Sequence, residues 1–178
     1  DIFPTGYMAA ENCDIKKGDT IAVWGCGPVG LFSIMSAIVL GAERVIAIDS
    51  IKERMDLARR LGAEVINFED GSVHDQIQEL TKGKGPDAVI DAVGMESMGA
   101  ETAMQKLVST VQSAVSASDR PYALNEAILS CRPGGVVSVP GVYMGSAVPT
   151  GMGAFMNKGL TMRTGQTHVH KYLDKLMQ

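Results

Sequence analysis

The glycine-rich segment WGCGPVG, residues 24–30, limits the folds open to this chain more than any other feature. It follows a short apolar run, Thr20–Trp24, and it precedes an apolar segment of helical length, 28–40. A G-x-G-x-x-G string alone is common, but between a strand and a helix it is typical of a loop that binds the two phosphates of a dinucleotide. The free N–H groups and the positive end of the helix would then face the phosphates.

The three glycines of this segment are expected to have three different roles. Gly25 permits the tight turn, Gly27 lets a pyrophosphate approach the backbone, and Gly30 lets the helix pack against the strand. Pro28 suits the first turn of the helix, where its missing N–H costs little. The alternative interpretation is a glycine turn that serves packing only.

A carboxylate stands where the second half of this motif requires one. Asp49 ends the next predicted strand, 19 positions after Gly30. An acid at that point typically accepts hydrogen bonds from the adenosine ribose diol, and it would repel the 2′-phosphate of NADP, so it favours NAD. Arg54 follows and is expected to brace the ribose or the adenine; the alternative is a solvated helix charge. Asp49 would otherwise be an ordinary strand-end residue.

Strand and helix patterns alternate along the rest of the chain, which predicts an α/β fold with a parallel sheet. Six strands fit a Rossmann doubly wound six-stranded parallel sheet with helices on both faces. "DAVIDAVG" and "GVVSVPGVY" are continuous apolar runs, as buried parallel strands are. The other predicted strands are 20–24, 44–48, 64–68 and 160–163, and the predicted helices are 7–12, 28–40, 52–61, 73–80, 125–131 and 169–177.

Two segments stand outside this alternation. Residues 96–122 are longer than a strand–helix link requires, and we interpret them as an inserted helix plus loop of unknown role. Residues 1–167 are expected to form an NAD-binding Rossmann domain, and 168–178 to begin a return segment toward a catalytic domain that this chain lacks. The strand ends near Val93, Pro140 and Val142 should line the crevice at the carboxyl edge of the sheet, where such folds bind ligands.

Composition excludes several partners. The net charge is -4 with no basic run, and aromatic residues make up 5% of the chain, so neither nucleic acid nor an anionic membrane is an expected partner. Cys13, Cys26 and Cys131 are far apart and set among apolar residues, which predicts buried reduced thiols. The apolar stretch 29–40 is too short to span a bilayer, and no signal-peptide pattern precedes it, so a soluble cytoplasmic protein is expected.

With these residues placed, the chain resembles the zinc-dependent medium-chain alcohol dehydrogenases over essentially its whole length. The resemblance rests on "GDTIAVWGCGPVGL", "GAERVIAIDSIKERMDLARRLGAEVIN", "DAVIDAVG" and "RPGGVVSVPGVY". Within the family the chain looks closest to the formaldehyde dehydrogenase-like branch, chiefly through "DIFPTGY", "GVY" and "MNKGLTMRTGQTHV".

The resemblance implies a role for Asp1. The family commonly has a catalytic zinc ligand four residues before the "TGY" threonine, and this branch uses aspartate there, so Asp1 looks like a catalytic residue and a ligand of Zn²⁺ in the full-length enzyme. The other two ligands, a Cys and a His of the catalytic domain, have no counterpart in this chain. The alternative is a disordered terminal residue. His74, His168 and His170 are interpreted as surface or helix-cap residues.

The same resemblance implies further contacts with the cofactor. Thr5 should pack near the nicotinamide, and Gly165 and Thr167 should offer backbone groups near the carboxamide. The remaining residues expected to contact the cofactor are Val29, Val93, Pro140 and Val142.

The function implied is hydride transfer between NAD and a small-molecule alcohol or aldehyde, with zinc polarising the substrate oxygen. The chain by itself is expected to be inactive. The resemblance also implies a homodimer or homotetramer, joined through the last strand, 160–163, and the loop that precedes it. Two rival classes stay open, namely a non-catalytic NAD-sensing Rossmann module and an S-adenosylmethionine-dependent methyltransferase.

Overall fold

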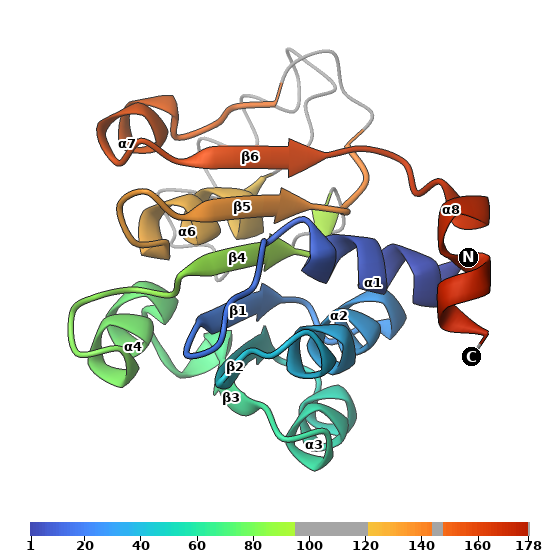
Figure 1. The fold of residues 1–178 in the computed structure, drawn as a ribbon. Helices are drawn as coiled ribbons and strands as arrows, with labels where there is room; N and C mark the ends of the chain where they lie inside the picture. The colour runs from blue at the N-terminus through green and yellow to red at the C-terminus, as the bar shows by residue number, and fades with distance from the viewer. Residues whose placement is uncertain (95–120, 144–147, 178) are drawn as a thin grey trace, which may run out of the picture.

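The computed structural model describes residues 1–94, 121–143 and 148–177, which form a parallel sheet with helices on both faces. Figure 1 shows all six strands pointing the same way. The strands are β1 (Thr20–Trp24), β2 (Arg44–Asp49), β3 (Glu64–Asn67), β4 (Ala88–Asp91), β5 (Val136–Val139) and β6 (Thr161–Thr164). The helices are α1 (Ile2–Glu11), α2 (Pro28–Val39), α3 (Lys52–Arg60), η1 (Phe68–Asp70), α4 (Val73–Leu80), α6 (Tyr122–Ser130), α7 (Met152–Asn157) and α8 (Val169–Leu176).

The strand order is β3-β2-β1-β4-β5-β6, which confirms the predicted doubly wound Rossmann sheet. The chain reverses its direction of travel across the sheet between β1 and β4, which pair in parallel with Trp24 beside Asp91. In open sheets of this type, ligands bind outside the carboxyl ends of the strands at this reversal. The fold therefore places the glycine segment, which follows β1, at the expected position.

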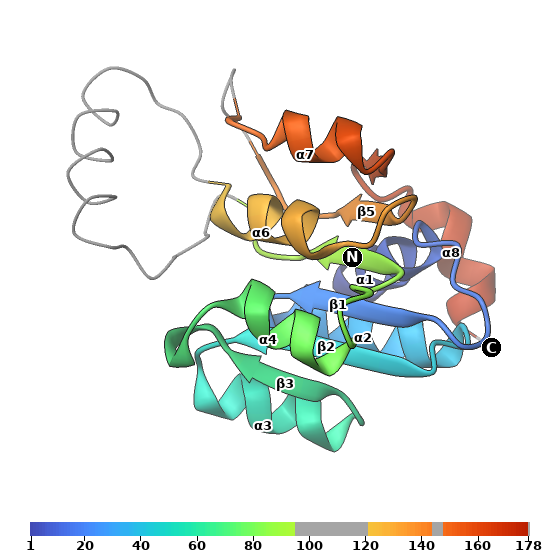
Figure 2. The same ribbon diagram turned by 90° about the vertical axis from the view of Figure 1, so that its left-hand side faces the viewer.

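The sheet is covered on both faces, as Figure 1 and Figure 2 show. Side chains of β1 alternate between two apolar cores: Ile21 and Val23 pack with residues of α1, α2 and α3, whereas Ala22 and Trp24 pack with α4 and α6. Alternation follows from the two-residue period of a strand. Burial on both faces explains why these strands are apolar without interruption.

Two strands are shorter than their apolar runs predicted. β4 ends at Asp91 and β5 at Val139, although the runs continue to 94 and 143. Gly94 adopts φ +64, and Pro140 has no N–H to donate to a neighbouring strand. The ends of both runs therefore leave the sheet and become the loops of the crevice.

Several helices differ from the prediction. α1 begins at Ile2, five residues earlier than expected, and it includes Pro4 in its first turn, where proline is tolerated. α6 likewise begins at Tyr122 instead of 125. α7 and η1 were missed because both are short and α7 contains Gly153, a weak helix former. The predicted inserted helix of 96–122 lies almost entirely outside the described residues.

The last helix, α8, packs against the first helix, α1. Tyr172 of α8 is buried against Tyr7 of α1, with ring centroids 5.7 Å apart. The Tyr172 hydroxyl donates a hydrogen bond of 2.9 Å to Glu11, and Lys171 and Lys175 make ion pairs with the same carboxylate. Both ends of the chain therefore lie on one side of the molecule (Figure 1).

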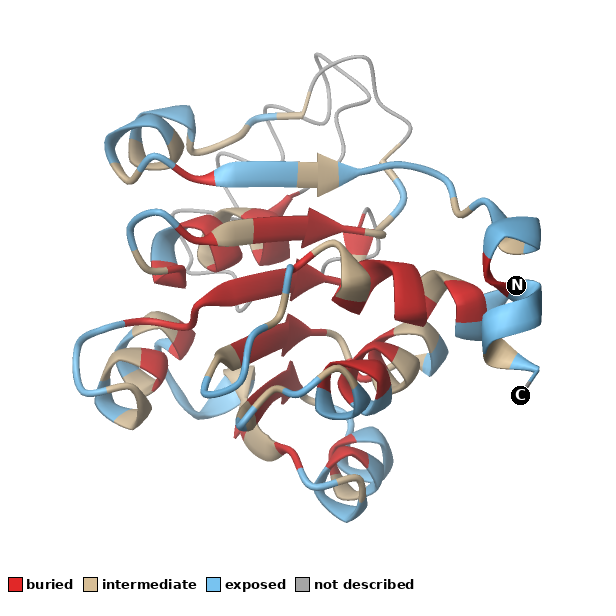
Figure 3. Cartoon of the chain, in the orientation of Figure 1, coloured by how far each residue is buried: buried red, intermediate tan, exposed pale blue. Residues whose placement is uncertain are grey.

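β6 forms an edge of the sheet and is mostly exposed, unlike the buried central strands (Figure 3). Among the described strands, β5 is its one neighbour. Within the described ranges, no helix combines the length and apolar character needed to cross a bilayer.

Candidate functional site

The turn after β1 has the backbone geometry that the glycine pattern predicts. Gly25 adopts φ +92, a left-handed conformation that side chains disfavour. Its N–H donates a hydrogen bond of 2.8 Å to the carbonyl of Ile48 on β2. A Cβ at Gly25 would lie 2.8 Å from Cγ2 of Val93, so the turn also packs against the loop after β4.

Gly27 and Gly30 differ in what surrounds them. A Cβ on Gly30 would lie 1.9 Å from the carbonyl oxygen of Gly25, so only glycine permits α2 to approach the turn this closely. A Cβ on Gly27 would meet no atom of the described residues within 4 Å. Gly27 is the N-cap of α2, and Pro28 occupies the first turn. The absence of a side chain at Gly27 therefore serves no internal packing contact and leaves room for a group outside the chain.

The start of α2 offers donors to such a group. The first N–H groups of a helix have no intrahelical acceptor, and the helix dipole makes this end positive. Val29 and Gly30 supply these N–H groups, because Pro28 has none and the Leu31 N–H already donates to the Gly27 carbonyl at 2.9 Å. The arrangement suits an anion such as a pyrophosphate.

Asp49 lies directly beside this turn. Its Oδ2 accepts a hydrogen bond of 2.7 Å from the N–H of Cys26, and its Oδ1 accepts from the N–H groups of Ser50 and Ile51 at 2.8 and 2.9 Å. Only 7% of the residue is exposed. A carboxylate can accept about four hydrogen bonds. Three backbone donors therefore leave room for about one more from a ligand, unless the ligand displaces one of them.

The charges around the turn come from Asp49 and Arg54. Burial raises the pKa of the Cys26 thiol to about 12, the negative charge of Asp49 adds to this, and the positive charge of Arg54 opposes it. Cys26 is therefore a neutral, fully buried thiol and not a nucleophile. Arg54 itself is exposed on the first turn of α3, where its electrostatic effect still reaches the turn.

The loops after β4 and β5 come together next to the glycine turn. A Cβ on Gly94 would lie 2.5 Å from the backbone nitrogen of Val142, and one on Gly141 would lie 2.6 Å from the nitrogen of Gly94. The Gly141 N–H donates to the carbonyl of Asp91 at 3.0 Å. Val93 and Val142, both predicted to contact a cofactor, therefore belong to two loops in direct contact.

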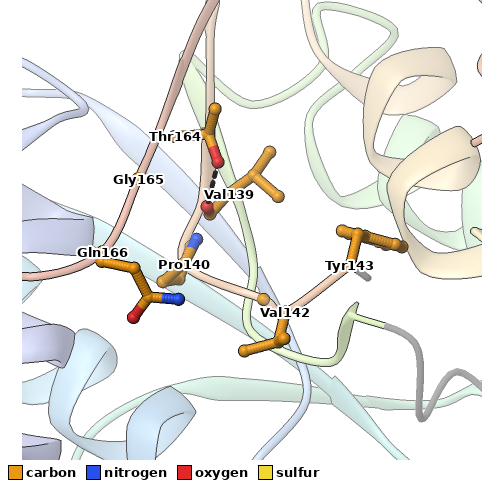
Figure 4. A pocket seen from close by; sticks show the side chains of 8 residues that line it. Val139, Pro140, Val142, Tyr143, Thr164, Gly165 and Gln166 are labelled. Carbon is orange, nitrogen blue, oxygen red and sulfur yellow. Dashed lines mark hydrogen bonds between the residues drawn. The ribbon is translucent and has the colours of Figure 1, made fainter. Parts of the chain in front are cut away.

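A hollow of about 180 Å³ opens between the ends of β5 and β6 (Figure 4). Pro140 and Val142 line it from the loop after β5, and Gly165 lines it from the loop after β6; all three are residues for which the sequence predicts contact with the cofactor. The Thr164 hydroxyl donates a hydrogen bond of 2.9 Å to the carbonyl of Val139, which ties the two walls together. The sequence prediction missed Tyr143, Thr164 and Gln166, which also line the hollow.

Thr5 and Thr167 lie apart from that hollow. Thr167 lines a second depression of about 250 Å³ with His168, Val169 and His170. Its Oγ1 is buried without a hydrogen-bond partner in the described part of the chain. Thr5 lies in α1, where its hydroxyl donates to the carbonyl of Asp1 at 2.8 Å. His168 is the N-cap of α8, as expected, while His74 is half-buried and shares a 3.3 Å hydrogen bond with Ser130.

Asp1 is exposed and is the N-cap of α1, although its side chain makes no capping hydrogen bond. Among the described residues there is no group of three or more His, Cys, Asp or Glu side chains that could hold a metal ion. The described part of the chain therefore does not make a zinc site, and Asp1 could supply only one ligand of such a site.

Sequence reasoning also missed a second carboxylate. Asp91 is fully buried at the end of β4, and it accepts a hydrogen bond of 2.6 Å from the hydroxyl of Tyr143. The sequence did contain a signal for Asp91, because it is an acid inside the apolar run "DAVIDAVG". A carboxylate that is buried in such a run needs hydrogen-bond donors around it.

The comparisons with known proteins agree with this geometry. The family model for the zinc-binding dehydrogenases matches residues 28–107. An uncharacterized zinc-type alcohol dehydrogenase-like protein of Bacillus subtilis is 36% identical over all of this chain, which covers 46% of that protein. An NADP-dependent isopropanol dehydrogenase of Thermoanaerobacter brockii is 45% identical over 53% of this chain, which covers 27% of that protein.

A solved structure, the alcohol dehydrogenase TADH from Thermus sp. ATN1, has a TM-score of 0.77 and 35% identity. The match covers 99% of this chain and 44% of that one. The chain thus spans less than half the length of these relatives. By sequence and by fold, it belongs to the zinc-type medium-chain alcohol dehydrogenase family.

Proposed function

We propose that this chain is the NAD-binding part of a zinc-type alcohol dehydrogenase. The observation that carries the proposal is the contrast between Gly27 and Gly30: the first faces open space at the N-terminus of α2, and the second is required by internal packing. Open space beside unpaired helix N–H groups suits the pyrophosphate of a dinucleotide.

Asp49 selects the cofactor in this proposal. It lies at the end of β2, in contact with the glycine turn, where an adenosine ribose would reach it. The 2′-phosphate of NADP would bring negative charge next to this carboxylate, so we expect NAD to bind more tightly. Arg54 would brace the ribose or the adenine from α3. The Thermoanaerobacter brockii relative is named as NADP-dependent, so the ratio of the NAD and NADP affinities of this chain is the quantity that tests the role of Asp49.

The nicotinamide end would lie over the other half of the sheet. Bound NAD supplies the acceptor for a hydride in alcohol oxidation. Val93, Pro140 and Val142 would hold the ring and exclude water, and Thr5, Gly165 and Thr167 would lie near it. Val29 would contact the cofactor at the start of α2. The buried Oγ1 of Thr167, which has no partner in the described residues, would gain one from such a ligand.

We assign zinc and substrate to the whole enzyme. Asp1 would supply one ligand of the Zn²⁺ ion, with the other ligands coming from protein outside the described residues. The substrate class is a small alcohol or aldehyde. The motifs "DIFPTGY" and "GQTHV" support a formaldehyde dehydrogenase-like type. We expect this chain alone to be inactive, because Asp1 would supply only one of the zinc ligands.

Three further proposals concern the assembled protein. The exposed edge at β6 supports a homodimer or homotetramer in which this edge is covered. Residues 168–178 would begin a return segment beyond the cofactor domain of 1–167. The three cysteines are free, and free thiols are typical of proteins in a reducing compartment, which supports a cytoplasmic location.

Isothermal titration calorimetry of the chain with NAD, NADP and S-adenosylmethionine tests the function. We expect NAD to bind most tightly, and we expect Asp49→Ala to weaken NAD while the affinity for NADP holds or improves. A preference for S-adenosylmethionine would instead support the methyltransferase class. NAD binding with no activity in the complete protein would support a sensing module.

A further inference from the structure

A fully buried carboxylate, Asp91, joins the two loops that carry Val93 and Val142. Its Oδ1 accepts hydrogen bonds from the N–H groups of Val93 and Gly94, at 3.0 and 3.1 Å. Its Oδ2 accepts the hydroxyl of Tyr143 at 2.6 Å. The side chain therefore contacts the loop after β4 and the loop after β5 at the same time.

Because Asp91 is buried, the folded structure depends on these hydrogen bonds. Asp91 has no exposed surface, and its neighbours on the same face of the sheet belong to the apolar core beside α6. A buried carboxylate is tolerated only where hydrogen bonds replace its hydration. Each donor is thus held in place, because losing one would leave an acceptor in an apolar surrounding unsatisfied.

Through Tyr143, the hydrogen bond to Asp91 also fixes the loop that lines the hollow between β5 and β6. Val142 and Tyr143 are adjacent, but their side chains point in different directions (Figure 4). The ring of Tyr143 packs against the apolar core, whereas Val142 is 49% exposed. Anchoring the Tyr143 hydroxyl to Asp91 therefore sets the direction of Val142, which lines the hollow between β5 and β6.

Asp91 and Asp49 serve opposite halves of the sheet. Asp49 ends β2, while Asp91 ends β4, on the other side of the reversal in the strand order. The two nucleotides of a dinucleotide occupy the two halves. A group that shapes the loops after β4 and β5 should therefore affect the nicotinamide nucleotide and leave the adenosine half alone.

We propose that Asp91 and Tyr143 are positioning residues that shape the nicotinamide side of the site through their mutual hydrogen bond. This inference rests on the proposed function, because it presupposes a dinucleotide across the crevice. Tyr143 also lines the hollow, but its hydroxyl is bonded to Asp91, so the effect of this hydrogen bond passes through the loops that carry Val93 and Val142.

The test compares two ligands that differ only in the nicotinamide end. NAD and ADP-ribose are titrated by calorimetry into the chain and into Tyr143→Phe, which removes one oxygen and keeps the ring. We expect Tyr143→Phe to weaken NAD about five- to tenfold and to leave ADP-ribose within about twofold. Asp91→Asn should change the ratio of the two affinities in the same direction, since an amide is a weaker partner for the hydroxyl.

Tyr172→Phe is the matched control, because its hydroxyl is bonded to Glu11 at the distant contact between α1 and α8. It should leave both affinities unchanged. Thermal unfolding of each variant shows that it is folded at the titration temperature. Equal weakening of both ligands, or no change in their ratio, would overturn the inference. Failure of the unsubstituted chain to bind either ligand would overturn the proposed function instead.

Discussion

The carboxylate of Asp49 accepts a hydrogen bond of 2.7 Å from the backbone N–H of Cys26, so the residue that should read the ribose also holds the glycine turn. Asp49→Asn removes the negative charge and nearly keeps the shape of the side chain. Its one amide oxygen can accept either from Cys26 or from Ser50 and Ile51, while the NH2 group leaves the other side without an acceptor. The variant therefore holds the turn only in part, and it has no negative charge that opposes a 2′-phosphate. We expect the ratio of NAD to NADP affinity to fall about tenfold or more, a difference of about 1.4 kcal/mol.

Fluorescence titration of both cofactors with the same protein measures that ratio. Asp49→Ala is the companion variant, and it should also lose about 1–3 kcal/mol of stability, because three backbone N–H groups lose their acceptor. An unchanged ratio in Asp49→Asn would show that this carboxylate does not select the cofactor.

Gly27 and Gly30 provide a matched pair of alanine substitutions. In Gly30→Ala the new methyl would collide with the carbonyl oxygen of Gly25, so we expect a loss of about 1–3 kcal/mol in the free energy of unfolding. In Gly27→Ala the methyl meets open space, so stability should change little.

For the affinity for NAD, we expect Gly27→Ala to have a large effect although it changes stability little. Gly27→Ala fills the space that the pyrophosphate would occupy and should weaken NAD about tenfold or more. Urea denaturation and calorimetry on both variants make the comparison. If Gly27→Ala binds NAD as the unsubstituted chain does, the phosphates do not lie against this residue.

Glu126 should make stability depend on pH. Burial raises the pKa of Glu126 above its ordinary value of 4.5, and the Trp24 N–H and the charge of His74 offset this only in part. A raised pKa means that the folded state favours the neutral acid. The contribution of this group to stability is therefore complete below the unfolded value and is lost as the pH rises through the folded value.

Glu126→Gln removes this dependence and keeps an oxygen that can accept from Trp24. The free energy of unfolding of the variant should equal that of the unsubstituted chain at about pH 4 and exceed it at about pH 7. Chemical denaturation across this range measures the difference. A variant that is less stable than the unsubstituted chain at the higher pH would contradict the assignment.

Self-association should depend on the outer side of β6. The Thr161 N–H donates to Gly135 at 3.1 Å, so it faces β5, and alternation along a strand turns the N–H of Met162 to the free edge. Met162→Pro removes an outward donor and leaves the pairing with β5 intact. We expect this variant to stay folded and to lose dimers in light scattering. Dimers that persist would place the interface elsewhere.

The sequence predicted the fold well because its strongest signals are local. All six strands were predicted, and so were the tight turn at Gly25 and the close packing of α2 at Gly30. Features that depend on distant contacts were not predicted. The hydrogen bond between Asp91 and Tyr143 joins residues 52 positions apart in the sequence. A periodic pattern of apolar residues cannot predict a contact between two such distant residues.

The site was predicted only in part for the same reason. Strand-end logic placed Pro140 and Val142 at a hollow, but the extra hydrogen bonds of Asp49 arise from the fold of its own turn. α7 escaped prediction because a six-residue helix containing Gly153 carries too little periodic signal. Thr167 proved to lie in a depression separate from Gly165, although the two are near neighbours in sequence.

A crystal structure of the chain with NAD tests the central claim most directly. We predict that the pyrophosphate lies within hydrogen-bonding distance of the first N–H groups of α2, above Gly27, with the adenosine ribose at Asp49. An empty crevice at saturating NAD, or a dinucleotide bound with its ribose away from Asp49, would contradict the account.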